Sequence, residues 1–309
     1  MTTIDVADLD TIYLSYDEPQ KEEFWIKIKN MVPWAKRVDG IKGSDAAHKA
    51  AAAASDTDRF VLVDGDNLPD PAFFNQRLTL DSSNVDCVFR YRAKNHVNGL
   101  MYGNGGLSIW TRDFVNHMRT HENTDGRDET TVEFCFDPKY IAMHDCYSTT
   151  YPNGSAFQAW RAGFREGVKM CLNQGRRPSV GTFKERVHAR NLDHLTIWHN
   201  VGADVDNGMW AVFGSRLGTY KTMLTDWDYT EVQDFDKLTE LWEEHGDVPK
   251  GPVWRAEELE ESLRTQLDLP MNTLTEDQSR FFKHHYRSNW RNRGIMTTEM
   301  DVIRQQEGW

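Results

Sequence analysis

The chain has 309 residues, and its 36 Lys and Arg residues stand against 48 Asp and Glu residues, which gives a formal net charge of −12. A chain of this length can bury a sizeable core, so we expect one large globular domain or a domain with an appendage. The acidic balance argues against non-specific binding to nucleic acid over the whole surface, because such binding depends on neutralising phosphates.

The sequence also bears on location. No apolar run is long enough to span a bilayer, and the first residues have neither the basic region nor the apolar stretch of a signal peptide. We therefore expect a cytoplasmic protein with no membrane partner. The cysteines are widely spaced and form no paired metal-ligand motif, so they are predicted to be reduced and mostly buried: Cys87, Cys135, Cys146 and Cys171.

The first sixty residues alternate between strand-like and helix-like segments. Residues 11–15 are predicted as a buried strand that stops before a proline, and the apolar spacing of residues 22–32 predicts a helix. A weaker strand at 35–38 precedes a helix that Ser44 or Asp45 can cap. This alternation predicts a parallel sheet with helices on its faces.

An Asp-Gly-Asp motif at residues 64–66 directly follows the apolar run 60–63, which predicts a strand covered on both faces. Carboxylates there supply hard oxygen ligands at the edge where open α/β sheets bind their ligands. An isolated motif of this kind is more often a simple turn. Asp17 and Asp39 also follow predicted parallel strands, however, so three strand ends bring carboxylates to one edge. We therefore predict a metal and phosphate site.

The clearest helical pattern follows Ser155, a good N-cap residue, and its apolar positions keep to one face. Arg161, Arg165 and Lys169 recur every four residues on another face. Such a stripe is commonly a solvated helix surface. The alternative is a clamp for the phosphates of a ligand, for which the guanidinium fork is well shaped.

The rest of the second half is less regular. Residues 140–143 are predicted as a strand that ends at His144 and Asp145, and a polar loop is expected at 147–155. Residues 196–201 are also predicted as a strand followed by a turn. The glycine-rich segment 98–110 fits either close backbone approach to a ligand or an irregular turn.

The composition becomes acidic and helical from about residue 227, so we place a boundary near residue 226. Bases and aromatics interleave at 280–293. This pattern fits an amphipathic helix that packs on the rest of the chain, or a surface that binds a nucleic-acid strand.

Taken together, these features resemble the GT-A fold of glycosyltransferases, in particular family 2-like members with a DxD motif. The resemblance covers roughly residues 10–115 and rests on Tyr16-Asp17-Glu18-Pro19 as the first strand end, Asp39 as the base-recognising acid and Asp64-Gly65-Asp66 as the DxD motif. It implies an α/β, GT-A-like (Rossmann-like) fold, with a mostly parallel mixed sheet flanked by helices and a C-terminal helical extension. The implied domains are a catalytic domain at 8–226, divided near residue 115 into a nucleotide-sugar half and an acceptor half, and the extension at 227–309.

The same resemblance implies a nucleotide-sugar donor, most simply a UDP-sugar, and a bound Mn²⁺ or Mg²⁺ ion. A hard divalent cation prefers carboxylate and phosphate oxygens and neutralises charge on the leaving diphosphate. The metal ligands expected on this basis are Asp64, Asp66 and His144. The residues expected to contact the donor are Tyr16, Asp17, Asp39, Lys42, Asp64, Arg161 and Arg165.

The segment 155–169 is similar, more loosely, to glycosyltransferase-like proteins of tailed phages. This likeness implies 5-hydroxymethylcytosine or a related hydroxymethylpyrimidine in phage DNA as acceptor, within the host cytoplasm. Basic clusters at Arg161/Arg165, Arg176/Arg177 and 280–293 favour DNA, whereas the net charge opposes it. A polysaccharide, a protein or a small molecule stays open as the acceptor.

For an inverting transfer, a carboxylate must remove the proton of the acceptor hydroxyl. Asp145 is the first choice because it follows a predicted strand in the acceptor half, and His144 beside it could carry a proton. His199 and Glu166 are alternatives. The chain lacks an obvious Glu-Asp base motif and a Gln-x-x-Arg-Trp motif, so the stereochemistry stays open. A nucleotidyltransferase and a non-catalytic sugar- or partner-binding module are the other function classes.

Overall fold

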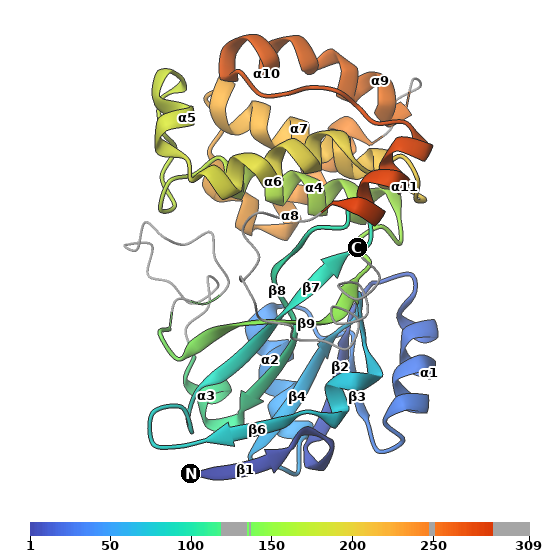
Figure 1. Ribbon diagram of the computed structural model, residues 1–309, viewed down its shortest axis with the longest axis vertical. Helices are drawn as coiled ribbons and strands as arrows, with labels where there is room; N and C mark the ends of the chain where they lie inside the picture. The colour runs from blue at the N-terminus through green and yellow to red at the C-terminus, as the bar shows by residue number, and fades with distance from the viewer. Residues whose placement is uncertain (119–134, 136, 247–250, 287–309) are drawn as a thin grey trace.

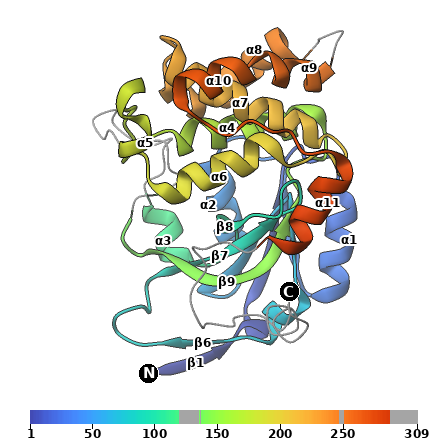
Figure 2. The ribbon, with the colours of Figure 1, turned by 45° about the horizontal axis from the view of Figure 1, so that its top comes forward.

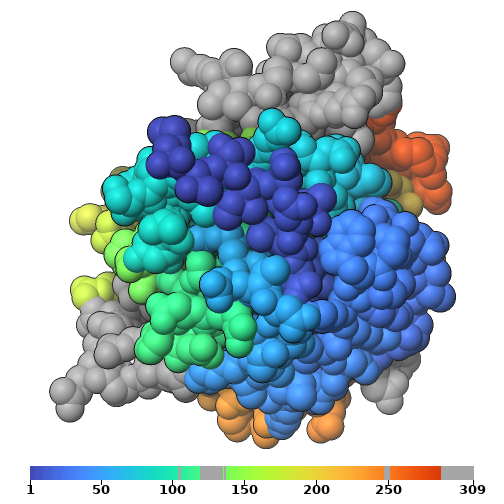
Figure 3. All heavy atoms as spheres, turned by 90° about the horizontal axis from the view of Figure 1, so that it is seen from below, coloured from blue at the N-terminus to red at the C-terminus, as the bar shows by residue number. Residues whose placement is uncertain are grey.

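The computed structural model describes residues 1–118, 135, 137–246 and 251–286. These residues form a sheet half and a layer of helices that covers the sheet at the carboxyl ends of most of its strands (Figures 1 and 2). Among the coloured atoms in the view from below, most belong to the N-terminal part of the chain, blue to green, and later helices show only at the rim (Figure 3). Among the described helices, none is both long and apolar enough to cross a membrane.

The main sheet has seven strands in the order β3-β2-β4-β8-β7-β9-β5. Their bounds are β2 (Asp10–Ser15), β3 (Lys36–Asp39), β4 (Arg59–Asp64), β5 (Asn67–Pro69), β7 (Val88–Asn95), β8 (Met101–Thr111) and β9 (Tyr140–Thr150). A separate two-stranded sheet pairs β1 (Thr2–Asp5) with β6 (Arg77–Leu80) in antiparallel register.

Strand directions confirm the predicted α/β class with a mostly parallel sheet. Strand β2 pairs in parallel with both β3 and β4, while β8 runs antiparallel to β4 and to β7. Strand β9 is parallel to β7, and β5 is antiparallel to β9. Five of the seven described strands therefore point one way and only β5 and β8 point the other. The ends of β2, β3 and β4 meet at one edge, as predicted.

The sheet is curled. Asp64 ends β4 and Asn67 begins β5, although β8, β7 and β9 lie between these two strands in the sheet. Three peptide links reach at most about 11 Å. Four strand spacings in a flat sheet would separate β4 from β5 by about 19 Å. The sheet must therefore curve so that residues 64–67 cross its open end.

Helices α1 (Lys21–Met31) and α2 (Ser44–Ala54) follow β2 and β3, as the β-α alternation predicted. The predicted cap of α2 is wrong, because the N-cap is Gly43, with no capping side chain. The remaining helices are α3 (Arg112–His117), α4 (Ala156–Met170), α5 (Phe183–Arg186), α6 (Ala189–Asn200), α7 (Gly208–Leu224), α8 (Phe235–His245), α9 (Gly251–Glu258), α10 (Glu260–Leu267) and α11 (Glu276–His285). Short 3₁₀ turns occupy Val6–Asp8, Pro71–Asn75, Val180–Thr182 and Tyr229–Gln233.

Helices α4 and α7 form the centre of the helical layer and touch through their backbones. A Cβ added at Gly163 would lie 2.0 Å from the Ala211 carbonyl oxygen, and one at Gly214 would lie 2.1 Å from that of Trp160. Such distances are far inside van der Waals contact, so any side chain would force the helices apart. Glycines with this role recur at four-residue spacing on both helices: Gly163, Gly167, Gly214 and Gly218.

The helical layer extends across residue 226. One core cluster contains Phe164 of α4, Val212 of α7, Leu238 of α8 and Ala256 of α9. Residues before and after the expected boundary thus share buried apolar contacts. The division of the chain at residue 226 stays a prediction.

A buried cation joins α7 to α6, α9 and α10. Arg216 of α7 has no exposed surface. Its guanidinium donates to carbonyl and side-chain oxygens at 2.7 to 3.4 Å, namely His199 O, Ala256 O, Glu260 Oε1, Asn200 Oδ1 and Thr273 Oγ1. Every nitrogen is therefore paired within the fold, as a buried charge requires.

Two strand predictions in the second half are wrong. Residues 196–200 belong to α6, because Leu195 and Trp198 lie three residues apart and are both buried, which overrides the β-propensity of the segment. Strand β9 continues to Thr150 rather than ending before His144, because Tyr147 and Ser148 are buried and the end of β9 pairs with Asn67–Pro69.

The other predictions in this part have mixed outcomes. The Ser155 hydroxyl caps α4 as predicted, accepting a hydrogen bond from the Gln158 amide at 3.2 Å. The glycine-rich segment forms a turn at Gly99, where φ is +75°, and then becomes β8. All four cysteines are free, but only Cys87 and Cys171 are buried. The sequence also predicts a strand at 132–136, and these residues lie mostly outside the described part of the chain.

The start of the basic and aromatic C-terminal segment is described. It forms the end of α11, where Lys283 pairs with Asp204 at 2.6 Å and donates to the His96 carbonyl at 3.2 Å. The described part of this segment therefore packs as a helix against the β7–β8 turn. Residues 287–293 lie outside the described part of the chain.

Candidate active site

Asp64 and Asp66 flank the sharp link between β4 and β5, and both are partly buried. Burial is the largest cause that raises the pKa of Asp64 to about 8, and the nearby Asp66 and Glu18 carboxylates act in the same direction. Burial also raises the pKa of Asp66. Among the described residues, no group donates a hydrogen bond to Asp64. Two carboxyl groups therefore lie here without a cation in direct contact, and burial disfavours their charged forms.

The position of Asp66 is fixed from two strands. Its carboxylate accepts hydrogen bonds from Asn67 Nδ2 at 2.7 Å and from Thr150 Oγ1, at the end of β9, at 3.0 Å. Asn67 in turn accepts from Ser148 Oγ at 3.2 Å. The curl of the sheet thus places Asp66 between the ends of β4 and β9.

Glycine is required at position 65 because the Glu18 side chain lies very close to its backbone. A Cβ at this position would lie 2.4 Å from the Glu18 carboxyl carbon. The Gly65 carbonyl also accepts a hydrogen bond from the Tyr13 hydroxyl at 2.9 Å. The Glu18 carboxylate accepts a hydrogen bond from the Tyr16 amide at 2.8 Å, and burial raises the pKa of Glu18. The loop after β2 therefore folds over the Asp-Gly-Asp link and brings a third carboxylate near it.

Arg161 of α4 faces these carboxylates. Burial lowers its pKa, while the charges of Asp17, Asp66 and Glu18 act in the opposite direction, so all three lie within electrostatic range of the guanidinium. Among the described residues, Arg161 forms no ion pair and donates no hydrogen bond. Its donors are therefore available for an anion between α4 and the sheet edge.

Aromatic rings hold the two arginines of α4. The Arg161 Cζ atom lies 5.1 Å from the Phe157 ring centre and 5.0 Å from that of Phe235 in α8. The Arg165 Cζ atom also lies 5.0 Å from the Phe235 ring centre. Two of the three cations of the predicted stripe, Arg161 and Arg165, are thus packed against aromatic rings of α4 and α8 rather than spread over open solvent.

Asp39 lies at the neighbouring strand end and is already paired. Lys21 Nζ donates to its carboxylate at 2.8 Å and Ser15 Oγ at 2.7 Å, while Arg37 approaches to 3.2 Å. The hydrogen bond from Lys21 is the largest cause that lowers the pKa of Asp39. Its side chain is still 40% exposed, so a ligand can reach it.

The other residues predicted to contact the donor lie around this edge. Tyr16 is exposed, and its carbonyl accepts from Lys21 Nζ at 2.7 Å. Asp17 is exposed, and its carbonyl accepts from Gln158 at 3.5 Å. Lys42 pairs with Asp236 of α8 at 3.3 Å, with both side chains about three-quarters exposed. This pair joins the loop after β3 to α8.

The structure does not bring His144 and Asp145 to this edge. Both lie in the middle of β9, where His144 is exposed and Arg92 approaches it at 3.2 Å, and where Asp145 acts electrostatically on Tyr91. Asp145 precedes Thr150, the contact of Asp66, by five residues, or about 16 Å along an extended strand. Their predicted place at a strand end is wrong because β9 is longer than expected.

His199 and Glu166 lie in the helical layer. His199 is fully buried in α6, its Nε2 atom is 3.0 Å from Thr219 Oγ1, and burial lowers its pKa to about 3. Its predicted strand end is wrong because α6 includes it. Glu166 of α4 accepts a hydrogen bond from the Tyr102 hydroxyl at 2.6 Å. Of the predicted bases, it is the one that shares a helix with Arg161.

Sequence reasoning missed several residues of the site. Glu18 was part of the motif but had no role, and its proximity to Gly65 depends on the path of a loop that no pattern predicts. Thr150 was expected in a loop. Phe235 comes from the C-terminal extension, and nothing in its sequence context pointed to the sheet edge.

Asp64 and Asp66 could supply part of the ligand set of a divalent cation, but not all of it. Asp64 and Asp66 are hard ligands whose raised pKa values a cation would lower. In the described part of the chain, no set of three His, Cys, Asp or Glu residues is arranged to hold a metal by itself. Mg²⁺ is commonly held by one or two carboxylates together with substrate phosphates and water, which is the arrangement these residues permit.

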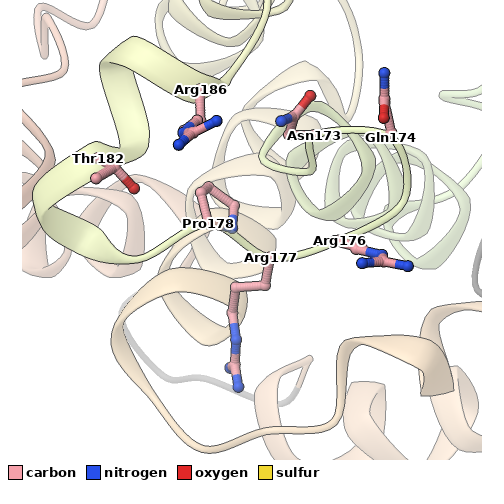
Figure 4. Close-up of a pocket in the computed structure, with 7 residues that line it drawn as sticks. All are labelled: Asn173, Gln174, Arg176, Arg177, Pro178, Thr182 and Arg186. Carbon is pink, nitrogen blue, oxygen red and sulfur yellow. The ribbon is translucent and has the colours of Figure 1, made fainter.

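A separate hollow of about 550 Å³ lies beyond the end of α4. Figure 4 shows its arginines pointing in different directions. Arg177 donates to the carbonyls of Thr222 and Thr225 at 3.2 and 3.0 Å, which ties it to the end of α7. This hollow therefore does not present a convergent set of charges, in contrast to the sheet edge.

Comparisons with known proteins give little further information. No family model matches the chain, and no curated protein matches it. A solved structure of a glycosyltransferase involved in glycosylation of the major capsid of PBCV-1 is 15% identical, covers 43% of this chain and 82% of its own, and has a TM-score of 0.27. HddC from Yersinia pseudotuberculosis is 16% identical, covers 50% and 78%, and has a TM-score of 0.24. At these TM-scores the likenesses carry no argument.

Proposed function

We propose that the protein is a metal-dependent glycosyltransferase that moves a sugar from a nucleotide-sugar to a hydroxyl acceptor. One observation carries this proposal. Asp64 and Asp66 lie at the carboxyl ends of parallel strands without a cation in direct contact, and Arg161, whose hydrogen-bond donors are unused, lies within electrostatic range of Asp66. Uncompensated, perturbed groups that converge on one place are more typical of a functional site than of a structural ion pair.

Each group has a defined task in this proposal. Asp64 and Asp66 would hold Mn²⁺ or Mg²⁺, which when bound neutralises charge on the donor diphosphate. Arg161 would donate to the phosphate oxygens, because its fork matches them. Tyr16, Asp17, Asp39 and Lys42 would border the nucleoside of a UDP-sugar, and Arg165 would add positive charge.

The transfer itself needs a proton acceptor. The acceptor oxygen bonds to the anomeric carbon, the bond from that carbon to the diphosphate oxygen breaks, and the diphosphate keeps the electron pair. The hydroxyl proton passes to a carboxylate. We propose Glu166 for this role, because of the predicted bases it is the one that lies on α4, the helix of Arg161. Asp145 stays a prediction from the sequence, at a greater distance.

The acceptor is proposed to be 5-hydroxymethylcytosine or a related base in DNA, on the basis of the sequence resemblance. Mass spectrometry of hydroxymethylcytosine DNA, incubated with the protein, Mn²⁺ and a panel of nucleotide-sugars, tests this proposal. Incorporation of sugar into modified DNA but not into unmodified DNA is the expected result. Transfer only to a polysaccharide, protein or small molecule would replace the DNA acceptor while keeping the enzyme class.

Turnover of the donor tests the enzyme class directly. Release of UDP from UDP-sugars in the presence of Mn²⁺ should fall by about a thousandfold in Asp66→Ala, because loss of a metal ligand removes several kcal/mol of charge stabilisation. Unchanged turnover in this variant would remove the assignment. Binding of nucleotide-sugar without metal dependence or turnover would indicate a binding module instead.

A further inference from the structure

We propose that Phe235 of α8 is a positioning residue for the diphosphate, because it fixes the guanidinium of Arg161 toward the sheet edge. This inference rests on the proposed function, and it assigns part of the donor site to the C-terminal extension. It goes beyond the sequence resemblances, which cover roughly residues 10–115 and, more loosely, residues 155–169.

The contacts of Phe235 are symmetrical. Its ring centre lies 5.0 Å from the Cζ atoms of both Arg161 and Arg165, and Arg161 is covered on another side by Phe157 at 5.1 Å. Two like charges therefore share one aromatic ring. An aromatic face attracts each cation, and it offsets part of the repulsion between the two guanidinium groups.

Phe235 is not needed to anchor its own helix. It is the first residue of α8 and is 40% exposed. The helix is instead held by Leu238, which is 1% exposed, and by Trp242, whose ring lies 5.1 to 5.6 Å from those of Phe157, Trp160 and Trp210. Loss of the Phe235 ring should therefore leave the fold of the helical layer intact.

The functional effect follows from the flexibility of arginine. A long side chain loses rotamer freedom when it binds an anion, and a side chain already held in place loses less. Arg161 has no hydrogen bond to the described residues that would hold it, so the two rings are what restrains its direction. Removing one ring should weaken binding of a diphosphate but not of a ligand without phosphates.

Calorimetric titration with UDP, inorganic pyrophosphate and uridine, each with Mn²⁺, tests this inference. Phe235→Leu should bind UDP and pyrophosphate about tenfold more weakly than the wild type. Its affinity for uridine should be unchanged. Phe235→Tyr, which keeps the ring, should bind UDP as the wild type does. Phe281→Leu is a matched control, because Phe281 is 66% exposed on α11 and touches His285.

A double-mutant cycle separates positioning from a general loss of structure. In an Arg161→Gln background, Phe235→Leu should change UDP affinity less than twofold, because the group it holds is gone. Equal UDP affinity of wild type and Phe235→Leu would overturn the inference alone, as would an undiminished effect in the Arg161→Gln background. If the wild type binds neither UDP nor pyrophosphate, the inference and the proposed function fall together.

Discussion

Two arginines in the helical layer are held in opposite ways. Arg216 has no exposed surface and donates to five oxygen atoms of the surrounding helices and loops. Arg161 lies between aromatic rings and donates to none of the described residues. A charge paired within the fold stabilises structure, whereas a charge left unpaired beside carboxylates is available to a ligand.

The comparison is tested most strongly by removing each cation. Arg216→Met should lower the free energy of unfolding by about 3–5 kcal/mol, because carbonyls and Glu260 lose their buried partner. Arg161→Met should change it by less than about 1 kcal/mol. Urea unfolding at equilibrium measures both. Equal losses in the two variants would contradict the distinction between a structural and a functional arginine.

The backbone contact between α4 and α7 gives the next largest expected effect. Gly163→Ala should lower the free energy of unfolding by about 2–3 kcal/mol, because the new methyl group meets the Ala211 carbonyl. Gly181→Ala is the control, since a Cβ there meets nothing within 4 Å. A stable Gly163→Ala protein would show that α4, which carries Arg161, is not fixed by α7.

A smaller effect is expected from pH. Burial lowers the pKa of His199 to about 3 in the folded protein, below its unfolded value of about 6.5. Protons then bind the unfolded chain preferentially, so stability is present above pH 6.5 and is lost as the pH falls toward 3. This group should account for about 2 kcal/mol of loss between pH 7 and pH 5. His199→Gln should show a flatter pH profile of unfolding; an unchanged profile would assign the loss to other groups.

The sequence predicted the strand ends of the first half well because each strand there is short, buried and bounded by helix signals. Residues 60–63 and the acidic motif after them needed no tertiary information. The second half was harder to predict. His199 was expected in a strand because Thr196, Ile197 and Trp198 favour strands locally, yet helix packing determines their conformation.

The missing parts of the site have a common physical cause. Thr150 reaches Asp66 because the sheet curls, and Phe235 reaches Arg161 because α8 packs on α4. Both contacts join residues more than seventy positions apart, and local periodicity contains no information about them. Site residues that lie within one segment could be predicted from the sequence, whereas contacts between residues of distant segments could not.

The central claim is that Asp64, Asp66 and Arg161 form a metal–diphosphate site. Calorimetric titration with UDP, with Mn²⁺ and with chelator, of the wild type and of Asp66→Asn tests it most directly, with Asp277→Asn on the exposed face of α11 as control. We predict that the wild type and the control bind UDP at least tenfold more tightly with Mn²⁺ and that Asp66→Asn loses this gain. UDP binding that is equal with and without Mn²⁺, or unaffected by Asp66→Asn, would contradict the account.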